Sequence, residues 1–398
     1  MANPPRYLAP NRLLELSMHR GAITAAVLGA IALAVPSARA AEPDRAHRTP
    51  VAHGAASAKT AVAGPKLRAG LRKLFRRVGK SGAFVIDANS GQVLFSRKGG
   101  RERPLASNTK IFTTATALTR FEPGTRLETT VWSGDDVADG VSQALYLRGG
   151  GDPTLTGSGL SKLASRVRAA GVTFVQGPLR YDDTFLDRAT TIPQHGIRAE
   201  RIGTLSALTI DGGGPRDPAR DAARRFLDAL KNAGVSVGNS LTSAAVPFAP
   251  PAVPVAGLGS PTIAELSRSI NVPSNNFMAE MLLKDTGGQF GPSGSTAGGI
   301  GVIKQLGAER GFSFRGENGS GLSRRNRASP ASVARLLDSM IEVDETASDD
   351  EQLEQRQLRE AFVGSLAVAG KSGTLARRMR GTAAKGNCFA KTGTLNRV

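Results

Sequence analysis

The sequence is poor in the residue types that most cofactor sites and catalytic triads need. Its 398 residues include one cysteine, Cys388, which excludes an internal disulfide and a cysteine-rich zinc site. Of the four histidines, His19, His47 and His53 precede the part of the chain that is expected to fold. His195 alone could serve a Ser-His-Asp triad, and a histidine in a surface loop is the simpler interpretation. We therefore expect neither a metal ion nor a cofactor.

Long apolar runs are also scarce. The run at residues 22–35 follows Arg20 and precedes Ala38-Arg39-Ala40. A basic flank, a short apolar segment and an A-x-A site are typical of a secretory signal, and the run is shorter than the ~20 residues that span a membrane. We expect residues 1–40 to be a signal peptide that directs export to the periplasm or extracellular envelope; a buried N-terminal helix is the alternative. Residues 41–65 are predicted to be a flexible leader.

Acidic residues are few relative to basic ones. The chain has 52 Lys and Arg against 33 Asp and Glu, a net charge of +19. Such an excess favours polyanions such as an anionic cell wall, an anionic membrane surface or nucleic acid. The basic residues are scattered, and aromatics make up only 5%, so the pattern argues against nucleic acid. The oligomeric state is left open.

The folded part divides by sequence pattern into three segments. In residues 66–125, helical periodicity at 67–78 precedes β-rich runs at 82–87 and 92–96. The apolar stripe of that helix should pack on a sheet, and a helix lying on a membrane is the alternative. Residues 126–259 show short strand-like pieces between Gly- and Pro-rich loops, and residues 260–398 return to a helical pattern. The remaining predicted helices span 108–118, 219–233, 262–270, 277–283 and 330–341.

The first candidate site motif is Ser-Asn-Thr-Lys at 107–110, the one S-x-x-K in the chain. In a helix, Ser107 and Lys110 share a face, and a serine in the first turn lies near the positive end of the helix dipole. A serine hydroxyl is a poor nucleophile until a neighbouring base removes its proton. A partly buried Lys110 could be that base if its pKa is lowered. The alternative is that Ser107 caps the helix and Lys110 is a surface charge.

The second motif is Ser-Asn-Asn at 274–276, in a turn before a predicted helix. The hydroxyl of Ser274 could relay a proton to a leaving group, and the amide of Asn276 could hold Lys110 and the substrate. A rival S-x-N, Ser-Ile-Asn at 269–271, reads as the end of the preceding helix. Alternatively, Asn275 or Asn276 is an ordinary helix N-cap.

The third motif is Lys-Thr-Gly-Thr at 391–394. Lys391 would supply positive potential and Thr392 would bind a substrate carboxylate. Gly393 would let the substrate backbone approach, and the N–H groups of Thr394 and Ser107 would form an oxyanion hole. A near copy, Lys-Ser-Gly-Thr at 371–374, reads as a loop and is the less favoured third motif.

In this order, the three motifs resemble those of the serine penicillin-recognising enzymes. The segments 147–155, 182–184, 319–323 and 381–393 extend the resemblance to the D-alanyl-D-alanine carboxypeptidase/endopeptidase family, the class C low-molecular-mass penicillin-binding proteins. The resemblance covers residues 66–398. It implies the catalytic residues Ser107, Lys110, Ser274, Asn276 and Lys391, and the substrate-binding residues Thr392, Gly393 and Thr394.

The resemblance also implies a fold and a reaction. The fold is α/β (α+β): a penicillin-binding, β-lactamase-like transpeptidase domain, residues 66–125 and 260–398, split by an inserted, mainly β domain at 126–259. The activity is that of a serine D-Ala-D-Ala carboxypeptidase/endopeptidase that acts on peptidoglycan stem peptides through an acyl-enzyme and binds β-lactams. A β-lactamase and a non-catalytic penicillin-sensing or wall-binding protein are the alternatives. Because family members continue beyond the third motif, the chain is expected to be truncated at Val398.

Overall fold

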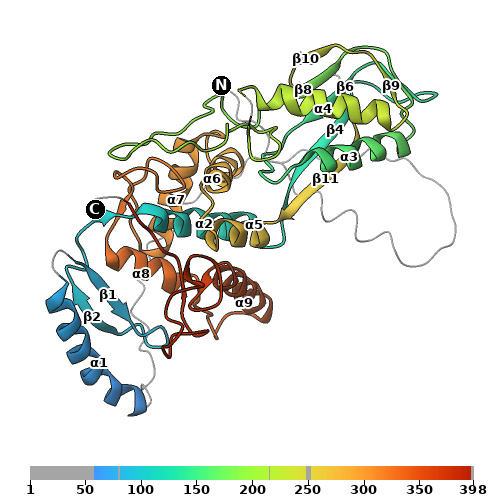
Figure 1. Cartoon of the computed structure of the whole chain (residues 1–398). Coiled ribbons are helices and arrows are strands. Elements are labelled where there is room, and N and C mark those ends of the chain that lie inside the picture. Colours follow the sequence, from blue (N-terminus) through green and yellow to red (C-terminus); the bar gives the residue numbers. More distant parts are fainter. Residues whose placement is uncertain (1–57, 79–80, 215, 248–251, 396–398) are drawn as a thin grey trace, which may run out of the picture. The chain divides into compact units, whose positions relative to one another are not determined.

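The computed structural model describes residues 58–78, 81–214, 216–247 and 252–395, which all belong to one compact unit (Figure 1). The predicted signal peptide, residues 1–40, and most of the predicted leader lie outside the described residues. No helix within the described ranges is long and apolar enough to cross a membrane.

The N-terminal segment forms a helix that packs on a hairpin. Helix α1 (Ala58–Arg77) begins earlier than the predicted start at Lys66, so part of the expected leader is helical. The rings of Phe75 and Phe95 stack with centroids 5.4 Å apart, which places Phe75 of α1 on β2. The predicted apolar stripe is only partly covered, since Leu67, Leu74 and Val78 are exposed. Strands β1 (Ala83–Ile86) and β2 (Val93–Arg97) pair antiparallel, as the hairpin pattern predicted.

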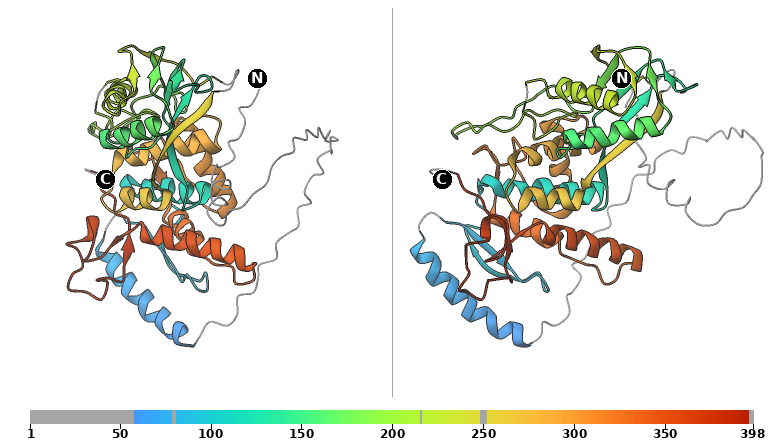
Figure 2. Two further views of the ribbon diagram at one scale, coloured as in Figure 1. Left: turned by 90° about the vertical axis from the view of Figure 1, so that its right-hand side faces the viewer. Right: turned by 45° about the vertical axis from the view of Figure 1, so that its right-hand side comes forward.

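The middle segment contains a five-stranded mixed sheet in the order β10-β8-β6-β4-β11 and a small parallel sheet in the order β5-β7-β9. Helices α3 and α4 contact each other and cover one face of the larger sheet (Figure 2). The bounds are β4 Arg126–Ser133, β5 Val141–Ser142, β6 Leu145–Arg148, α3 Gly157–Ala169, β7 Phe174–Val175, β8 Leu179–Asp182, α4 Pro218–Asn232, β9 Ser236–Val237, β10 Leu241–Ser243 and β11 Val253–Thr262.

Within residues 126–259, α4 matches the helix predicted at 219–233, whereas α3 is a second helix that the sequence pattern did not predict. The buried side chains of α3 recur at helical spacing: Leu160, Leu163, Ala164 and Val167. These side chains pack in one apolar core with α4 and the five-stranded sheet. The amphipathic pattern is therefore present in the sequence, but the glycines at the start of α3 lower its helix propensity.

The remaining elements form a mainly helical layer. Helices α2, α5, α6 and α7 contact one another around a second apolar core, to which α9 adds Phe362. The predicted helices correspond to α2, α4, α5, α6 and α8, whereas α7 and α9 were not predicted. The bounds are β3 Arg103–Pro104, η3 Ala106–Asn108, α2 Thr109–Phe121, α5 Ile263–Asn271, α6 Asn276–Phe290, α7 Thr296–Arg310, β12 Arg327–Ala328, α8 Pro330–Ser339, α9 Asp349–Gly364, β13 Ala367–Val368, η4 Gly373–Leu375 and β14 Phe389–Ala390.

Candidate active site

Ser107 lies in a tight turn that leads into α2. The turn starts at Ala106, whose φ of 50° is in the left-handed region, where a side chain is strained. Ser107 belongs to the short 3-10 helix η3, and the N-cap of α2 is Asn108. The Ser107 hydroxyl does not cap the helix and instead accepts a hydrogen bond from Lys110 Nζ at 3.1 Å. The strained turn therefore presents the hydroxyl to the lysine.

Lys110 is fully buried and is not a surface charge. Besides Ser107 Oγ, its Nζ donates to Asn276 Oδ1 at 2.6 Å and to the Ser320 carbonyl oxygen at 2.7 Å. Burial, followed by the nearby Lys391 ammonium, lowers the pKa of Lys110 to about 7. A large fraction of Lys110 is therefore neutral near neutral pH, as a general base requires.

The second motif forms the turn between α5 and α6. Ser274 has a φ of 67°, and Asn275 caps α6 by accepting a hydrogen bond from Met278 N. Because Asn275 takes the capping role, the amide of Asn276 is free to face Lys110. The hydroxyl of Ser274 accepts a hydrogen bond from Lys391 Nζ at 2.9 Å. The second and third motifs thus meet, although the two residues lie 117 positions apart in the chain.

The third motif follows β14 directly. Burial lowers the pKa of Lys391 to about 8, and Thr392 donates to the hydroxyl of Thr374 at 2.9 Å. A Cβ atom on Gly393 would lie 2.7 Å from the Leu105 carbonyl oxygen, so this segment runs against the turn that carries Ser107. Thr394 follows and is exposed.

The rival motifs hold other positions. Asn271 is buried and its amide donates to the hydroxyls of Thr114 and Ser365, an arrangement that ties α5 to α2. Lys371 is exposed, whereas Thr374 of the near copy accepts from Thr392 and its N–H donates to the Val272 carbonyl oxygen. His195 Nδ1 lies 2.6 Å from Glu317 Oε2 rather than beside Ser107.

Several site residues were not found by sequence reasoning. Glu280, on α6, is fully buried, and its carboxylate accepts the N–H groups of Gly319 and Ser320 at 2.8 and 2.7 Å. It thereby holds the loop whose Ser320 carbonyl accepts from Lys110. Glu200, from the middle segment, accepts from the amide of Asn276 at 2.6 Å. A glutamate within the apolar run Met278–Leu283 was the available signal for Glu280; no local pattern marks Glu200.

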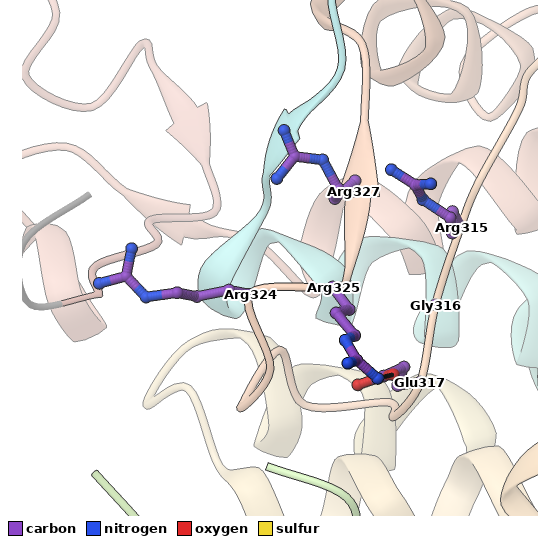
Figure 3. A pocket seen from close by; sticks show the side chains of 6 residues that line it. All are labelled: Arg315, Gly316, Glu317, Arg324, Arg325 and Arg327. Carbon is purple, nitrogen blue, oxygen red and sulfur yellow. Dashed lines mark hydrogen bonds and ion pairs between the residues drawn. The ribbon is translucent and has the colours of Figure 1, made fainter. Parts of the chain in front are cut away.

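A basic hollow is formed by residues that flank the Gly319–Ser320 loop in sequence. It is lined by Arg315, Gly316, Glu317, Arg324, Arg325 and Arg327 (Figure 3). Arg325 points toward Glu317 and pairs with it at 3.0 Å, while Arg315 pairs with Glu102 at 2.8 Å.

Among the described residues, no group of His, Cys, Asp and Glu side chains could hold a metal ion.

Comparisons with known proteins identify the family of this chain. The model of the D-Ala-D-Ala carboxypeptidase 3 (S13) family matches residues 74–214 and 213–398. A D-alanyl-D-alanine carboxypeptidase of Actinomadura sp. (strain R39) is 30% identical, over 80% of this chain and 73% of the relative. Carboxypeptidase DacB of Mycolicibacterium smegmatis is 29% identical, over 78% of this chain and 70% of that relative.

The fold has a solved counterpart as well. The crystal structure of penicillin-binding protein 4 (dacB) from Haemophilus influenzae superposes with a TM-score of 0.67 at 17% sequence identity. The match covers 79% of this chain and 84% of that one, and it confirms the predicted α/β fold of a penicillin-binding protein. With a family match over most of its length, the chain belongs to the D-Ala-D-Ala carboxypeptidase 3 (S13) family of peptidases.

Proposed function

We propose that this protein is a serine DD-peptidase that cleaves the D-Ala-D-Ala bond of peptidoglycan stem peptides through an acyl-enzyme. The observation that carries the proposal is the contact between Ser107 Oγ and the buried Nζ of Lys110, at 3.1 Å. A lysine whose pKa is lowered to about 7 can accept a proton from serine without a histidine. Relatives named as D-alanyl-D-alanine carboxypeptidases support the choice of substrate.

The reaction we propose assigns each motif a part. Neutral Lys110 takes the proton of Ser107 as Oγ forms a bond to the D-alanyl carbonyl carbon. The N–H groups of Ser107 and Thr394 donate hydrogen bonds to the developing oxyanion and stabilise it. The C–N bond then breaks, Ser274 relays a proton to the departing amine, and D-alanine leaves. Water hydrolyses the ester to free the peptide and Ser107.

Recognition of the substrate falls to the third motif. The ammonium of Lys391 and the hydroxyl of Thr392 would bind the terminal carboxylate of the peptide. Gly393 would let the peptide backbone lie alongside the motif. A β-lactam would acylate Ser107 in the same way, but its amine leaving group stays tethered, so the acyl-enzyme accumulates. A related crystal structure, of the Haemophilus influenzae protein, holds a β-lactam.

The wider setting is also proposed. A peptidase of stem peptides works on the envelope, which agrees with a signal peptide at residues 1–40. The net charge of +19 would favour an anionic cell wall, and the hollow lined by arginines is a candidate contact for it. We further propose that residues 66–125 and 260–398 form the peptidase domain and that residues 126–259 are inserted in it. The separate core of α3, α4 and the five-stranded sheet supports this division.

A fluorescent penicillin and a D-Ala-D-Ala peptide together test the proposal. The protein should be labelled covalently on the peptide that contains Ser107 and should release D-alanine, and Ser107→Ala should abolish both. Rapid turnover of the penicillin without D-alanine release would indicate a β-lactamase instead. A protein that neither turns over penicillin nor releases D-alanine would be a non-catalytic penicillin-sensing or wall-binding protein. An adduct on another serine would overturn the assignment of Ser107.

A further inference from the structure

The long connection between β8 and α4 reaches from the middle segment into the active site. Its buried residues Leu186, Ile192 and Leu205 belong to the apolar core of the helical layer, whereas Leu208 and Ile210, nearer α4, belong to the core beneath the five-stranded sheet. At the tip, the side chain of Gln194 clamps the backbone of Glu200: Nε2 donates to Glu200 O at 2.8 Å, and Oε1 accepts from Glu200 N at 2.7 Å. The position of Glu200 is thus fixed from both sides.

The carboxylate of Glu200 decides which way the amide of Asn276 faces. An asparagine amide has a carbonyl oxygen that accepts and an NH2 group that donates, in nearly the same shape. An ionised carboxylate only accepts, so the NH2 group must face Glu200, and Nδ2 lies 2.6 Å from Glu200 Oε1. The carbonyl oxygen Oδ1 is therefore turned toward Lys110 Nζ, 2.6 Å away.

The orientation of Asn276 in turn directs the lone pair of Lys110. A neutral amine has two N–H bonds and one lone pair. Asn276 Oδ1 and the Ser320 carbonyl oxygen accept the two N–H bonds, at 2.6 and 2.7 Å. The third direction points to Ser107 Oγ at 3.1 Å: the ammonium donates along it, and in neutral Lys110 it carries the lone pair. With the amide reversed, its NH2 group would face the amine, and the lone pair would be drawn away from Ser107.

Glu200 also contributes charge to this environment. The charged groups that act on Lys110 are Lys391, which lowers its pKa, and Glu280 and Glu200, which raise it. Glu280 is tied to two backbone N–H groups, whereas Glu200 is exposed and bonds to the amide next to the base. Removing the charge of Glu200 should therefore lower the pKa of Lys110 further, while removing its oxygen atoms should release Asn276.

We infer that Glu200, contributed by the middle segment, is a positioning residue for the acylation step: it locks the amide of Asn276 so that Lys110 points its lone pair at Ser107. The inference rests on the proposed function, since it assumes that Lys110 activates Ser107. It gives residues 126–259 a part in the chemistry and not only in the shape of the protein.

Two substitutions separate orientation from charge. Glu200→Gln keeps an oxygen that can accept from Asn276 and removes the charge, whereas Glu200→Ala removes both. We expect the maximal second-order rate of acylation by a fluorescent penicillin to fall ~10–10²-fold in the Ala variant, and to stay close to wild type in the Gln variant. In the wild type the acylation rate should rise with pH as Lys110 loses its proton. In both variants this rise should occur at lower pH, because the pKa of Lys110 is lower. Glu354→Gln, at an exposed position on α9, is the matched control and should change neither quantity.

The outcomes distinguish this inference from the proposed function. A wild-type protein that is not labelled on Ser107 overturns both. If the wild type is labelled and Glu200→Ala keeps its rate and pH midpoint, the inference alone is wrong. A Gln variant as slow as the Ala variant at every pH would contradict the role in orientation. Because Glu200 is exposed, thermal melting should show both variants folded like the wild type.

Discussion

Lys110 Nζ lies 3.1 Å from Ser107 Oγ; Ser107 belongs to η3, and Lys110 lies one turn later in the first turn of α2. The short separation in sequence makes the pair rigid, because the same turn of helix fixes both backbones. Burial then changes the chemistry of the lysine by lowering its pKa to about 7. A local motif thus sets the distance, while the surrounding fold sets the protonation state.

The rate of acylation should depend on pH through the two lysines of the site. Neutral Lys110 is the base, so the second-order rate with a β-lactam should rise with pH up to about 7, the value to which its pKa is lowered. Protonated Lys391 binds the carboxylate in our proposal, so the rate should fall above about 8. Stopped-flow labelling across this range measures both limbs. A rate that falls as pH rises through the first limb would contradict Lys110 as the base.

The two Lys-x-Gly-Thr segments should differ sharply in function. Lys391 donates to Ser274 inside the site, whereas Lys371 is exposed. Loss of a charge-assisted contact to the substrate typically costs ~10-fold or more in rate. We therefore expect Lys391→Met to reduce acylation by at least that factor and to remove the falling limb of the pH profile. Lys371→Met is the matched control; an equal loss there would make residues 371–374 the third motif.

A contact of the site can be predicted from the sequence where a local pattern brings its two residues together. Ser107 and Lys110 meet because residues three apart share a helix face, and that spacing is visible in the sequence. The meeting of Ser274 with Lys391 could be expected only from the resemblance to a family, since nothing local relates them. Glu200 was missed because it reaches Asn276 from a loop in another segment of the chain.

Helix α7 shows why some elements could not be predicted. Its sequence contains glycines that lower helix propensity, including Gly298 and Gly299. A Cβ atom on Gly299 would lie 2.1 Å from the Leu283 carbonyl oxygen of α6. The glycines therefore allow α7 to pack closely on α6. Tertiary packing outweighs local propensity here, and the packing partner cannot be read from the sequence of α7 itself.

Gly321 should be essential for the geometry of the Ser107 turn. Its φ is +93°, and a Cβ atom there would lie 1.9 Å from the Ala106 carbonyl oxygen. Gly321→Ala must displace one of the two backbones, and errors of ~1 Å in position can reduce a rate ~10²-fold. We expect a loss of labelling of that order and a lower melting temperature. Gly301→Ala, on α7, meets no atom within 4 Å and should retain labelling with equal or slightly higher stability. Equal labelling and equal melting temperatures of the two variants would contradict the role of Gly321.

Asp285 should make the stability of the protein depend on pH. It is fully buried on α6, and neither of its carboxylate oxygens has a hydrogen-bond partner within the described structure. Burial raises its pKa well above the usual range; the Asp152 carboxylate raises it further, and Lys284 offsets part of the effect. The folded state therefore favours protonated Asp285. Its contribution to stability is complete below the unfolded pKa and is lost as the pH rises through the folded pKa.

Asp285→Asn tests this directly, because asparagine cannot ionise. Leaving a buried charge unpaired costs about 1–3 kcal/mol or more, so the variant should melt above wild type at alkaline pH. The difference should shrink as the pH falls, since wild-type Asp285 is then protonated. Asp228→Asn, at an exposed position on α4, is the control and should follow wild type at every pH. Melting curves recorded from acidic to alkaline pH give the comparison. A difference between Asp285→Asn and wild type that stays constant over that range would show that Asp285 does not ionise in the folded protein.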